Sequence, residues 1–315
     1  MDFSIASILM LDGATNGAVY ALLGLATVLV FTVTRVIFFP QGEFVAYGAL
    51  TMAMLQAGKV PGTVWLLMML AVLAALMECW SRWHHDRNLM HGIKSGVIMA
   101  IPPLLIAWLT LWAAPQNFPM PVQALLSIAV VATFGPLVYR IAYQSLESAT
   151  PLVLLIVSVG VHFAMTGLGL LFFGAEGFRN PSFLTENWSV GPLSITGQVV
   201  IIFTTALLLI AALWVFFERT LFGKALRATA VNRTGARLMG ISTHAAGQFT
   251  FLLAAGIGAI VMGGAIQCLF GIKGRRWETH SVIGKFWNDA WVWPAEGETP
   301  VGAVTIEGAC YWRSI

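Results

Sequence analysis

The sequence predicts an all-α fold, a polytopic integral membrane helical bundle with about eight membrane segments, one of them short or re-entrant. Hydrophobic residues make up 58% of the 315 residues and charged residues 10%, whereas soluble proteins carry about 25% charged residues. The 20 Phe and 12 Trp would also make the surface of a water-soluble fold far too apolar. At about 20 apolar residues per crossing, the chain has room for about seven to nine helices and none for a separate soluble catalytic domain.

Eight apolar stretches account for these crossings, each bounded by charged residues or by Pro and Gly. They lie near 14–34, 44–57, 62–81, 93–113, 120–139, 151–173, 197–217 and 247–271. The second stretch, between Glu43 and Gly58, has only about 14 residues and is shorter than a full span. We therefore expect a short or re-entrant helix that is buried against other helices.

Basic residues orient the segments, because cytoplasmic loops hold an excess of Lys and Arg. The connection 218–246 carries five basic residues and one acidic residue, which places it in the cytoplasm. Counting back along the helices puts 174–196 outside and the loops 140–150 and 82–92 inside. This alternation requires that 44–57 crosses the membrane and that the N-terminus is outside. The N-terminus has no basic n-region, so we expect its helix to be retained rather than cleaved as a signal peptide.

The basic connection contains the strongest local pattern, a run of small and basic residues at 223–241. Asn232 is suited to cap the start of a short helix, and Gly240 is suited to end it. Ala236, Met239 and Gly240 are spaced to share one face of that helix. Small and apolar residues on a short helix suit docking into a groove of a partner protein. An ordinary basic cytoplasmic loop is the alternative interpretation.

This run resembles the coupling motif of ABC-transporter permeases, in the version found in the LivH-like family of branched-chain amino acid permeases. That family has Gly-Arg/Lys-Ala-x-Arg-Ala followed by a Gly-Ile ending. The present chain has Gly-Lys-Ala-Leu-Arg-Ala at 223–228 and Gly-Ile at 240–241.

Three further segments upstream match the family. Residues 16–22 resemble a helix of the family that has the pattern Asn-Gly…Tyr-Ala-Leu. Residues 42–49 resemble the family's Gly-Glu-Phe turn, which leads into a Gly-Ala helix. Residues 149–160 match the helix that follows a basic loop in the family. The resemblance covers about 8–58 and 139–265, and between them it extends only to hydropathy.

The resemblance implies a permease subunit of an ATP-driven importer of branched-chain amino acids, or of similar small nutrients such as amides or urea, in the bacterial inner membrane. The implied partners are ABC ATPase subunits, a second permease subunit, a periplasmic or extracellular substrate-binding protein and the lipid bilayer. Homodimeric and heterodimeric permease pairs both stay open. The sequence has no Gly-x-x-x-x-Gly-Lys-Ser/Thr motif, so ATP hydrolysis is expected in a separate subunit.

Two groups of residues are candidates for function. We assign to ATPase coupling Gly223, Arg227, Asn232, Arg233, Ala236 and Gly240. We assign to the translocation path or gate Asn16, Tyr20, Gln41, Gly42 and Glu43. An ionisable group at the edge of an apolar stretch is by default paired or functional, although Glu43 could instead serve as the acid at a helix N-terminus. Polar groups within apolar helices, such as Asn16, Tyr20 and His162, could equally serve as hydrogen-bonding links between helices.

We expect no catalytic residue, metal or cofactor. The most metal-like cluster, His84, His85, Asp86 and His91, fits no metal-binding spacing and is expected in a solvated loop. Cys79, Cys268 and Cys310 suggest neither a disulfide framework nor a zinc site. A net charge of +3 is too small to indicate nucleic-acid binding. A secondary transporter and an integral-membrane enzyme are the alternative functions, but mid-membrane acids and an inverted repeat are not evident.

The composition changes after the last apolar stretch. Residues 1–271 are expected to form the permease domain, and 272–315 an anomalous tail that holds 10 of the 31 charged residues and five of the 12 Trp. The family continues at this point with further membrane segments, so we expect the sequence after about 266 to be a shifted reading frame or an unrelated fusion. An interfacial tail with an aromatic belt is the alternative.

Overall fold

The computed structural model describes residues 3–86, 89–116, 118–147, 149–174, 187–190 and 193–270. Its long helices are α1 (Phe3–Thr34), α2 (Gln41–Gln56), α3 (Gly62–Asp86), α4 (Leu89–Ala113), α5 (Met120–Val138), α6 (Pro151–Phe173), α7 (Gly197–Arg219) and α10 (Thr243–Phe270). The shorter elements are η1 (Ala114–Gln116), η2 (Tyr139–Tyr143), η3 (Gln144–Leu146), α8 (Leu221–Val231) and α9 (Arg233–Leu238), with strands β1 (Asn187–Val190) and β2 (Leu193–Thr196).

Each of the eight predicted apolar stretches forms one long helix, which confirms the all-α membrane bundle. Seven of these helices are long and apolar enough to cross a membrane. The other, α2, has 16 residues, or about 24 Å at 1.5 Å per residue, against about 30 Å of hydrocarbon. Its side chains are mostly buried, including the polar Gln41 and Glu43. The expected short, buried helix is therefore present.

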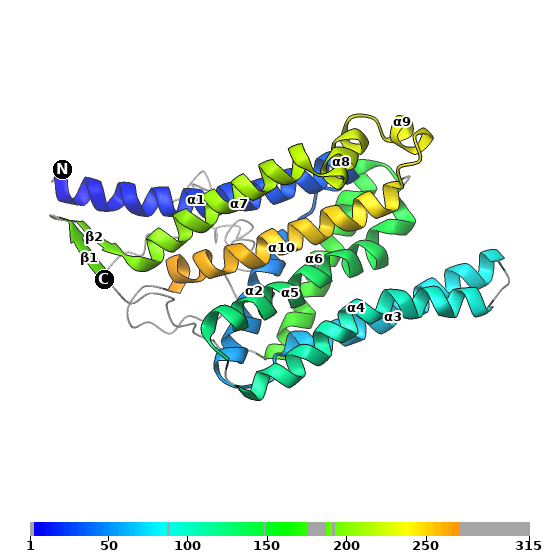
Figure 1. Ribbon diagram of the computed structural model, residues 1–315, viewed down its shortest axis with the longest axis horizontal. Coiled ribbons are helices and arrows are strands. Elements are labelled where there is room, and N and C mark those ends of the chain that lie inside the picture. The colour runs from blue at the N-terminus through cyan, green and yellow to red at the C-terminus, as the bar shows by residue number, and fades with distance from the viewer. Residues whose placement is uncertain are drawn as a thin grey trace, which may run out of the picture.

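Successive long helices run in opposite directions, so their connections lie at the two ends of the bundle (Figure 1). One end carries α8, α9, the end of α3 and the start of α4, and we call it the α8–α9 end. The N-terminus and the two strands lie at the opposite end. Helix α10 runs through the bundle and packs against α1, α2 and α5, whereas α3 and α4 pair mainly with each other.

Helices α5 and α10 approach each other unusually closely. A Cβ atom on Gly135 of α5 would lie 2.1 Å from the carbonyl oxygen of Phe251 on α10, so only glycine fits at this contact. Small residues allow such approach in membrane bundles, where van der Waals packing replaces the hydrophobic effect as the force between helices.

An aromatic cluster joins this contact to the start of α2. The ring of Phe38 lies 4.9 Å from that of Phe251 and 5.4 Å from that of Phe44. Tyr143 completes the cluster, with its ring 5.3 Å from Phe251. Tyr143 comes from η2, a π-helical turn that continues α5. The buried turn before α2 is thus held by rings from three separate parts of the chain.

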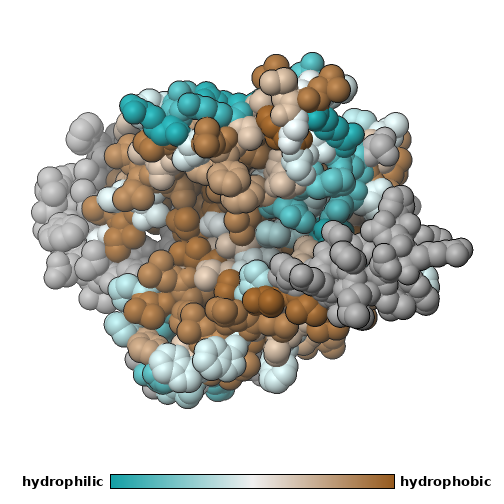
Figure 2. All heavy atoms as spheres, turned by 45° about the vertical axis from the view of Figure 1, so that its right-hand side comes forward, coloured by the Kyte–Doolittle hydropathy of each residue, from teal (hydrophilic) through white to brown (hydrophobic). Residues whose placement is uncertain are grey.

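The face of the bundle shown in Figure 2 is largely apolar. Large side chains such as Trp65, Trp80 and Trp108 are exposed on α3 and α4. In water, so many exposed apolar side chains would be unfavourable, whereas contact with lipid is favourable for them. The helices can lie in lipid because each satisfies its own backbone hydrogen bonds. The surface agrees with a protein that crosses the membrane several times.

Two local expectations need correction. The loop predicted at 82–92 is mostly helical, because α3 continues to Asp86 and α4 begins at Leu89; helices extend beyond their apolar cores where polar residues meet water. A short antiparallel hairpin, with Asn187 opposite Thr196, occupies part of the expected loop 174–196. Four-residue strands with alternating polarity are too short to stand out from loop composition.

The expected tail, 272–315, lies outside the described residues.

Candidate functional site

The segment after α7 folds into two short helices with separate caps. The Thr220 hydroxyl accepts a hydrogen bond of 3.0 Å from the backbone N–H of Gly223 at the start of α8. The side-chain oxygen of Asn232 accepts one of 2.9 Å from the N–H of Gly235 at the start of α9. Each cap satisfies an amide that the helix leaves without a partner. The predicted capping role of Asn232 is confirmed.

Gly240 ends α9 in the way expected from its sequence position. It has φ of +81°, in the left-handed region that favours glycine. Its N–H donates to the carbonyl of Arg237, and the N–H of Ile241 donates to that of Ala236, each at 3.0 Å. This pair of bonds is a Schellman motif, which turns the chain sharply toward α10.

Gly223 has a packing role that the sequence pattern did not reveal. A Cβ atom here would lie 2.3 Å from the carbonyl oxygen of Phe216 and 2.7 Å from Cα of Phe217. Helix α8 can therefore fold back against the end of α7 only with glycine at this position. Gly223 shapes the segment and does not present a docking surface.

The exposed face of α8 and α9 is more apolar than expected. Val231 and Met239 are 85% and 82% exposed, and Leu238 is similarly open. Ala236, expected on the same face as Met239, is instead 4% exposed, because α9 turns that side toward the protein. A shallow hollow of about 550 Å³ lies on this surface. It is lined by Arg227, Ala228, Val231, Asn232, Gly235, Ala236, Met239 and Ile241.

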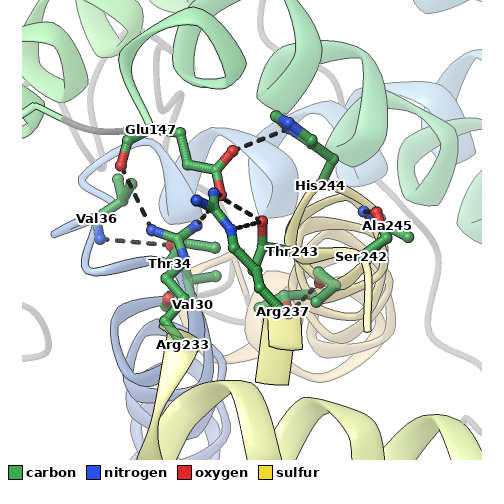
Figure 3. Close-up of polar contacts among 12 residues, drawn as sticks. Val30, Thr34, Val36, Glu147, Arg233, Arg237, Ser242, Thr243, His244 and Ala245 are labelled. Carbon is green, nitrogen blue, oxygen red and sulfur yellow. Dashed lines mark hydrogen bonds and ion pairs between the residues drawn. The ribbon is translucent and has the colours of Figure 1, made fainter. Parts of the chain in front are cut away.

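Behind this surface, one carboxylate gathers three basic side chains (Figure 3). Arg233 Nη2 and Arg237 Nη2 donate to Glu147 Oε1 at 2.7 and 3.0 Å. His244 Nδ1 lies 3.0 Å from Glu147 Oε2. Arg237 also donates through Nε to the Thr243 hydroxyl at 3.1 Å. We call these five residues the Glu147 cluster.

The surroundings of Glu147 favour its ionised form. Burial by itself would raise its pKa, but the hydrogen bond with Thr243 and the charges of Arg233, His244 and Arg237 together hold the pKa below the ordinary value of 4.5. By contrast, Arg227 pairs with Glu218 at 2.9 Å on the open surface, where both side chains are nearly half exposed. Exposed pairs of this kind contribute little to stability.

A second polar group lies at the start of α2. Glu43 Oε1 accepts a hydrogen bond of 2.9 Å from Thr166 and lies 3.3 Å from Nδ1 of the buried His162, both on α6. On the other side of α2, Gln41 Nε2 donates to the carbonyl of Ala254 on α10 at 2.9 Å. The polar turn therefore ties α2 to α6 and α10.

The remaining path candidates are spread over different parts of the bundle. Gly42 is half-buried beside Glu43. Asn16 is half-buried and Tyr20 is 48% exposed on α1. Tyr20 lies about 20 Å along the helix from Thr34, where α1 ends near the Glu147 cluster. The path candidates are thus distributed along the height of the bundle.

Comparison with known proteins now identifies the family. Residues 89–273, more than half of the chain, match the family model described as the permease component of branched-chain amino acid transport systems. The chain belongs to this permease family. No solved structure matches it significantly.

Three relatives illustrate the similarity. The permease is 25% identical over 256 residues to the high-affinity branched-chain amino acid transport system permease protein LivH of Escherichia coli K12. This alignment covers 80% of the present chain and 67% of LivH. It is 24% identical over 263 residues to BraD of Pseudomonas aeruginosa, with the same coverage. LivH of Salmonella typhimurium is 24% identical over 256 residues, again with 80% and 67% coverage.

The candidate residues chosen from the sequence did not include Thr166 or four members of the Glu147 cluster, namely Glu147, Arg237, Thr243 and His244. Glu147 had one local signal, as an acid in an otherwise basic loop. Thr166 had none, because a threonine in an apolar helix commonly bonds to its own backbone, as Thr166 also does to the carbonyl of His162 at 2.9 Å.

Proposed function

We propose that this chain is the permease subunit of an ATP-driven importer that carries branched-chain amino acids, or similar small nutrients such as amides or urea, across the bacterial inner membrane. Family membership supports the transport role, and the relatives are named for branched-chain amino acids. In this assignment a separate ABC ATPase supplies the energy, a second permease subunit completes the path, and an external binding protein delivers the substrate.

The observation that carries the proposal is the exposed apolar face of α8 and α9. Val231, Leu238 and Met239 are almost fully open to solvent at an end of the bundle that also carries several arginines. A soluble partner that covers these side chains would remove their unfavourable contact with water. The arginines favour the cytoplasmic side, where the ATPase subunits of an importer work.

The candidate coupling residues then divide by what they do. Gly223, Asn232 and Gly240 shape the two helices through close packing, capping and the left-handed turn. Arg233 anchors α9 to Glu147, and Ala236 packs inward. Arg227 borders the hollow on the exposed side. Leu238, which the motif did not single out, and Met239, which was expected on the docking face, are the better candidates for direct contact with the ATPase.

The polar turn at the start of α2 is our candidate for a gate in the translocation path. Glu43 and Gln41 are buried within the bundle and contact two different helices. Buried polar groups at membrane depth commonly mark substrate pathways. In this scheme Asn16 and Tyr20 lie farther along the path. Gly42 has no side chain and so takes up little space at the turn.

The direct test is to place an acidic side chain on the exposed apolar face. Met239→Glu should reduce co-purification with the ATPase subunits by about tenfold, a change of about 1.4 kcal/mol in binding free energy, and should reduce leucine uptake. Val60→Glu is the matched control, because Val60 is also an exposed apolar residue but precedes α3, away from α8 and α9. Normal ATPase binding and normal uptake by Met239→Glu would contradict the assignment.

A further inference from the structure

Glu147 occupies a position through which the α8–α9 segment is joined to the rest of the bundle. We infer that Glu147 is a positioning residue that transmits movement of α9 to helices α5, α6 and α10. This inference rests on the proposed function, since it assumes that a partner moves α9.

The geometry of the cluster supports a mechanical link. Arg233 and Arg237 come from the two ends of α9, and His244 comes from the first turn of α10. All three meet the same carboxylate within 3.0 Å. A second bond, from Arg233 Nη1 to the backbone carbonyl of Glu147 at 3.5 Å, joins α9 to the main chain as well. Both ends of α9 are therefore held at one point.

The position of Glu147 in the chain connects this point to the membrane helices. Glu147 directly follows η3, which continues α5 through η2, and it shortly precedes α6. Within the described chain, α9 packs mainly against its sequence neighbours α8 and α10. The Glu147 cluster is thus the polar connection from α9 to the α5–α6 side of the bundle, where His162 faces Glu43.

The charges make this link dependent on the carboxylate. The Glu147 side chain is only 10% exposed, so water and salt screen its interactions less than those of a surface pair. Without its negative charge, the guanidinium groups of Arg233 and Arg237 would be left close together and would repel each other. The cluster should then open, because one shared partner holds all three. A displaced α9 would still be folded but would no longer move with α5 and α6.

The test uses the assembled transporter in proteoliposomes, with leucine as the probe. Glu147→Gln should still co-purify with the ATPase and unfold in one cooperative transition, at a somewhat lower temperature than the parent protein because the charged contacts of Glu147 are lost. It should hydrolyse about tenfold more ATP for each leucine transported, which is within the usual range of coupling between sites. Glu147→Asp keeps the charge and should recover part of the coupling.

Glu218→Gln is the matched control. It also removes one carboxylate from an ion pair with an arginine at this end of the molecule, but that pair is exposed and joins α8 to α7. We expect its ATP-to-leucine ratio to equal that of the parent protein. If Glu147→Gln accumulates poorly, His244→Asn provides a milder change, since it removes one contact at a half-exposed position, and it should raise the ratio by a smaller factor.

The outcomes separate the two proposals. An unchanged ratio in Glu147→Gln and in His244→Asn would overturn the role of Glu147 and leave the proposed function intact. An equal rise in Glu218→Gln would also overturn it, because the effect would then follow from lost charge in general. A parent protein that neither binds the ATPase nor takes up leucine would overturn the proposed function itself.

Discussion

At the scale of single residues, the buried carboxylate of Glu43 meets partners from a helix that is distant in sequence. Glu43 accepts a hydrogen bond from Thr166 and faces His162 on α6. A buried carboxylate without such partners would be strongly unfavourable in an apolar interior. The contact thus explains how an acid can lie at the start of a membrane-embedded helix.

We expect Glu43→Gln to separate the structural and the transport roles of this carboxylate. The amide oxygen can still accept the bond from Thr166, so stability should change little, whereas loss of the acidic group should reduce leucine uptake by about tenfold if the turn is a gate. Glu43→Ala removes both interactions and should cost about 1–3 kcal/mol of stability. Thermal unfolding in detergent and uptake assays measure the two effects. Full uptake by Glu43→Gln would limit Glu43 to a structural role.

The lowered pKa of Glu147 predicts a defined response to acid. A carboxyl group whose pKa is lower in the folded state stabilises that state above its unfolded value of 4.5, and this contribution is lost as the pH falls through the folded pKa. In Glu147→Gln the group cannot titrate. Its unfolding temperature should therefore fall less steeply than that of the parent protein below about pH 4.5, and equal slopes would contradict the prediction.

At the scale of elements, the π-helical turn η2 directs its tyrosine side chains into the core and its arginine side chain toward α3. Tyr139 and Tyr143 enter the aromatic core, while Arg140 forms an ion pair with Glu78 of α3. Arg140 Nη1 also donates to Gln144 Oε1 at 2.9 Å. Single turns of π-helix often occur where a helix must redirect its side chains. Here η2 connects the α3–α4 pair to the central helices.

The ion pair between Glu78 and Arg140 should behave as a buried pair. Glu78→Met or Arg140→Met alone removes one charge of this largely buried pair and should cost about 3–5 kcal/mol. The double variant removes both charges and should be close to the parent protein in stability, because desolvation of the pair offsets much of its attraction. Thermal unfolding of the three variants measures the coupling, and additive single effects would show that the residues do not act as a pair.

The end of α9 gives a second prediction at this scale. Gly240→Ala places a side chain at φ of +81° and should cost about 1 kcal/mol, whereas Gly240→Asn should be tolerated better, because asparagine adopts this conformation more readily. Since Gly240 sets the direction of the chain into α10, Gly240→Ala should also weaken ATPase binding. Co-purification of both variants under identical conditions checks this order.

At the scale of the whole molecule, the short helix α2 decides the topology. It has 16 residues, yet it carries the chain away from the α8–α9 end to the start of α3. The direction of every later helix follows from that of α2. Its apolar neighbours shield it from lipid, so its limited length is compatible with a crossing.

Cysteine labelling tests this arrangement in a background without Cys79, Cys268 and Cys310. A probe at Met239 should react only from the cytoplasmic side. Probes at Lys59, after α2, and at Asn187, in β1, should react only from outside. The alternation of the helices and the basic α8–α9 end give this pattern. Labelling of Lys59 from the cytoplasm would show that α2 does not cross.

The sequence by itself determined the number and places of the membrane helices and the ends of α9. Long apolar stretches must become helices in lipid, because each helix satisfies its backbone hydrogen bonds within a single segment. Asn232 and Gly240 act on amides and carbonyls a few residues away, so their roles depend only on local chain chemistry. Family membership likewise followed from short ordered motifs.

Only the tertiary structure decided which polar groups meet. Glu147 lies 86 residues from Arg233 and Glu43 lies 123 residues from Thr166, and no local pattern encodes either contact. The inward direction of Ala236 and the close packing at Gly223 also depend on how α8 and α9 rest on the bundle. Helix packing sets these directions, because in lipid the shape of each contact rather than its apolar character selects the neighbour of each helix.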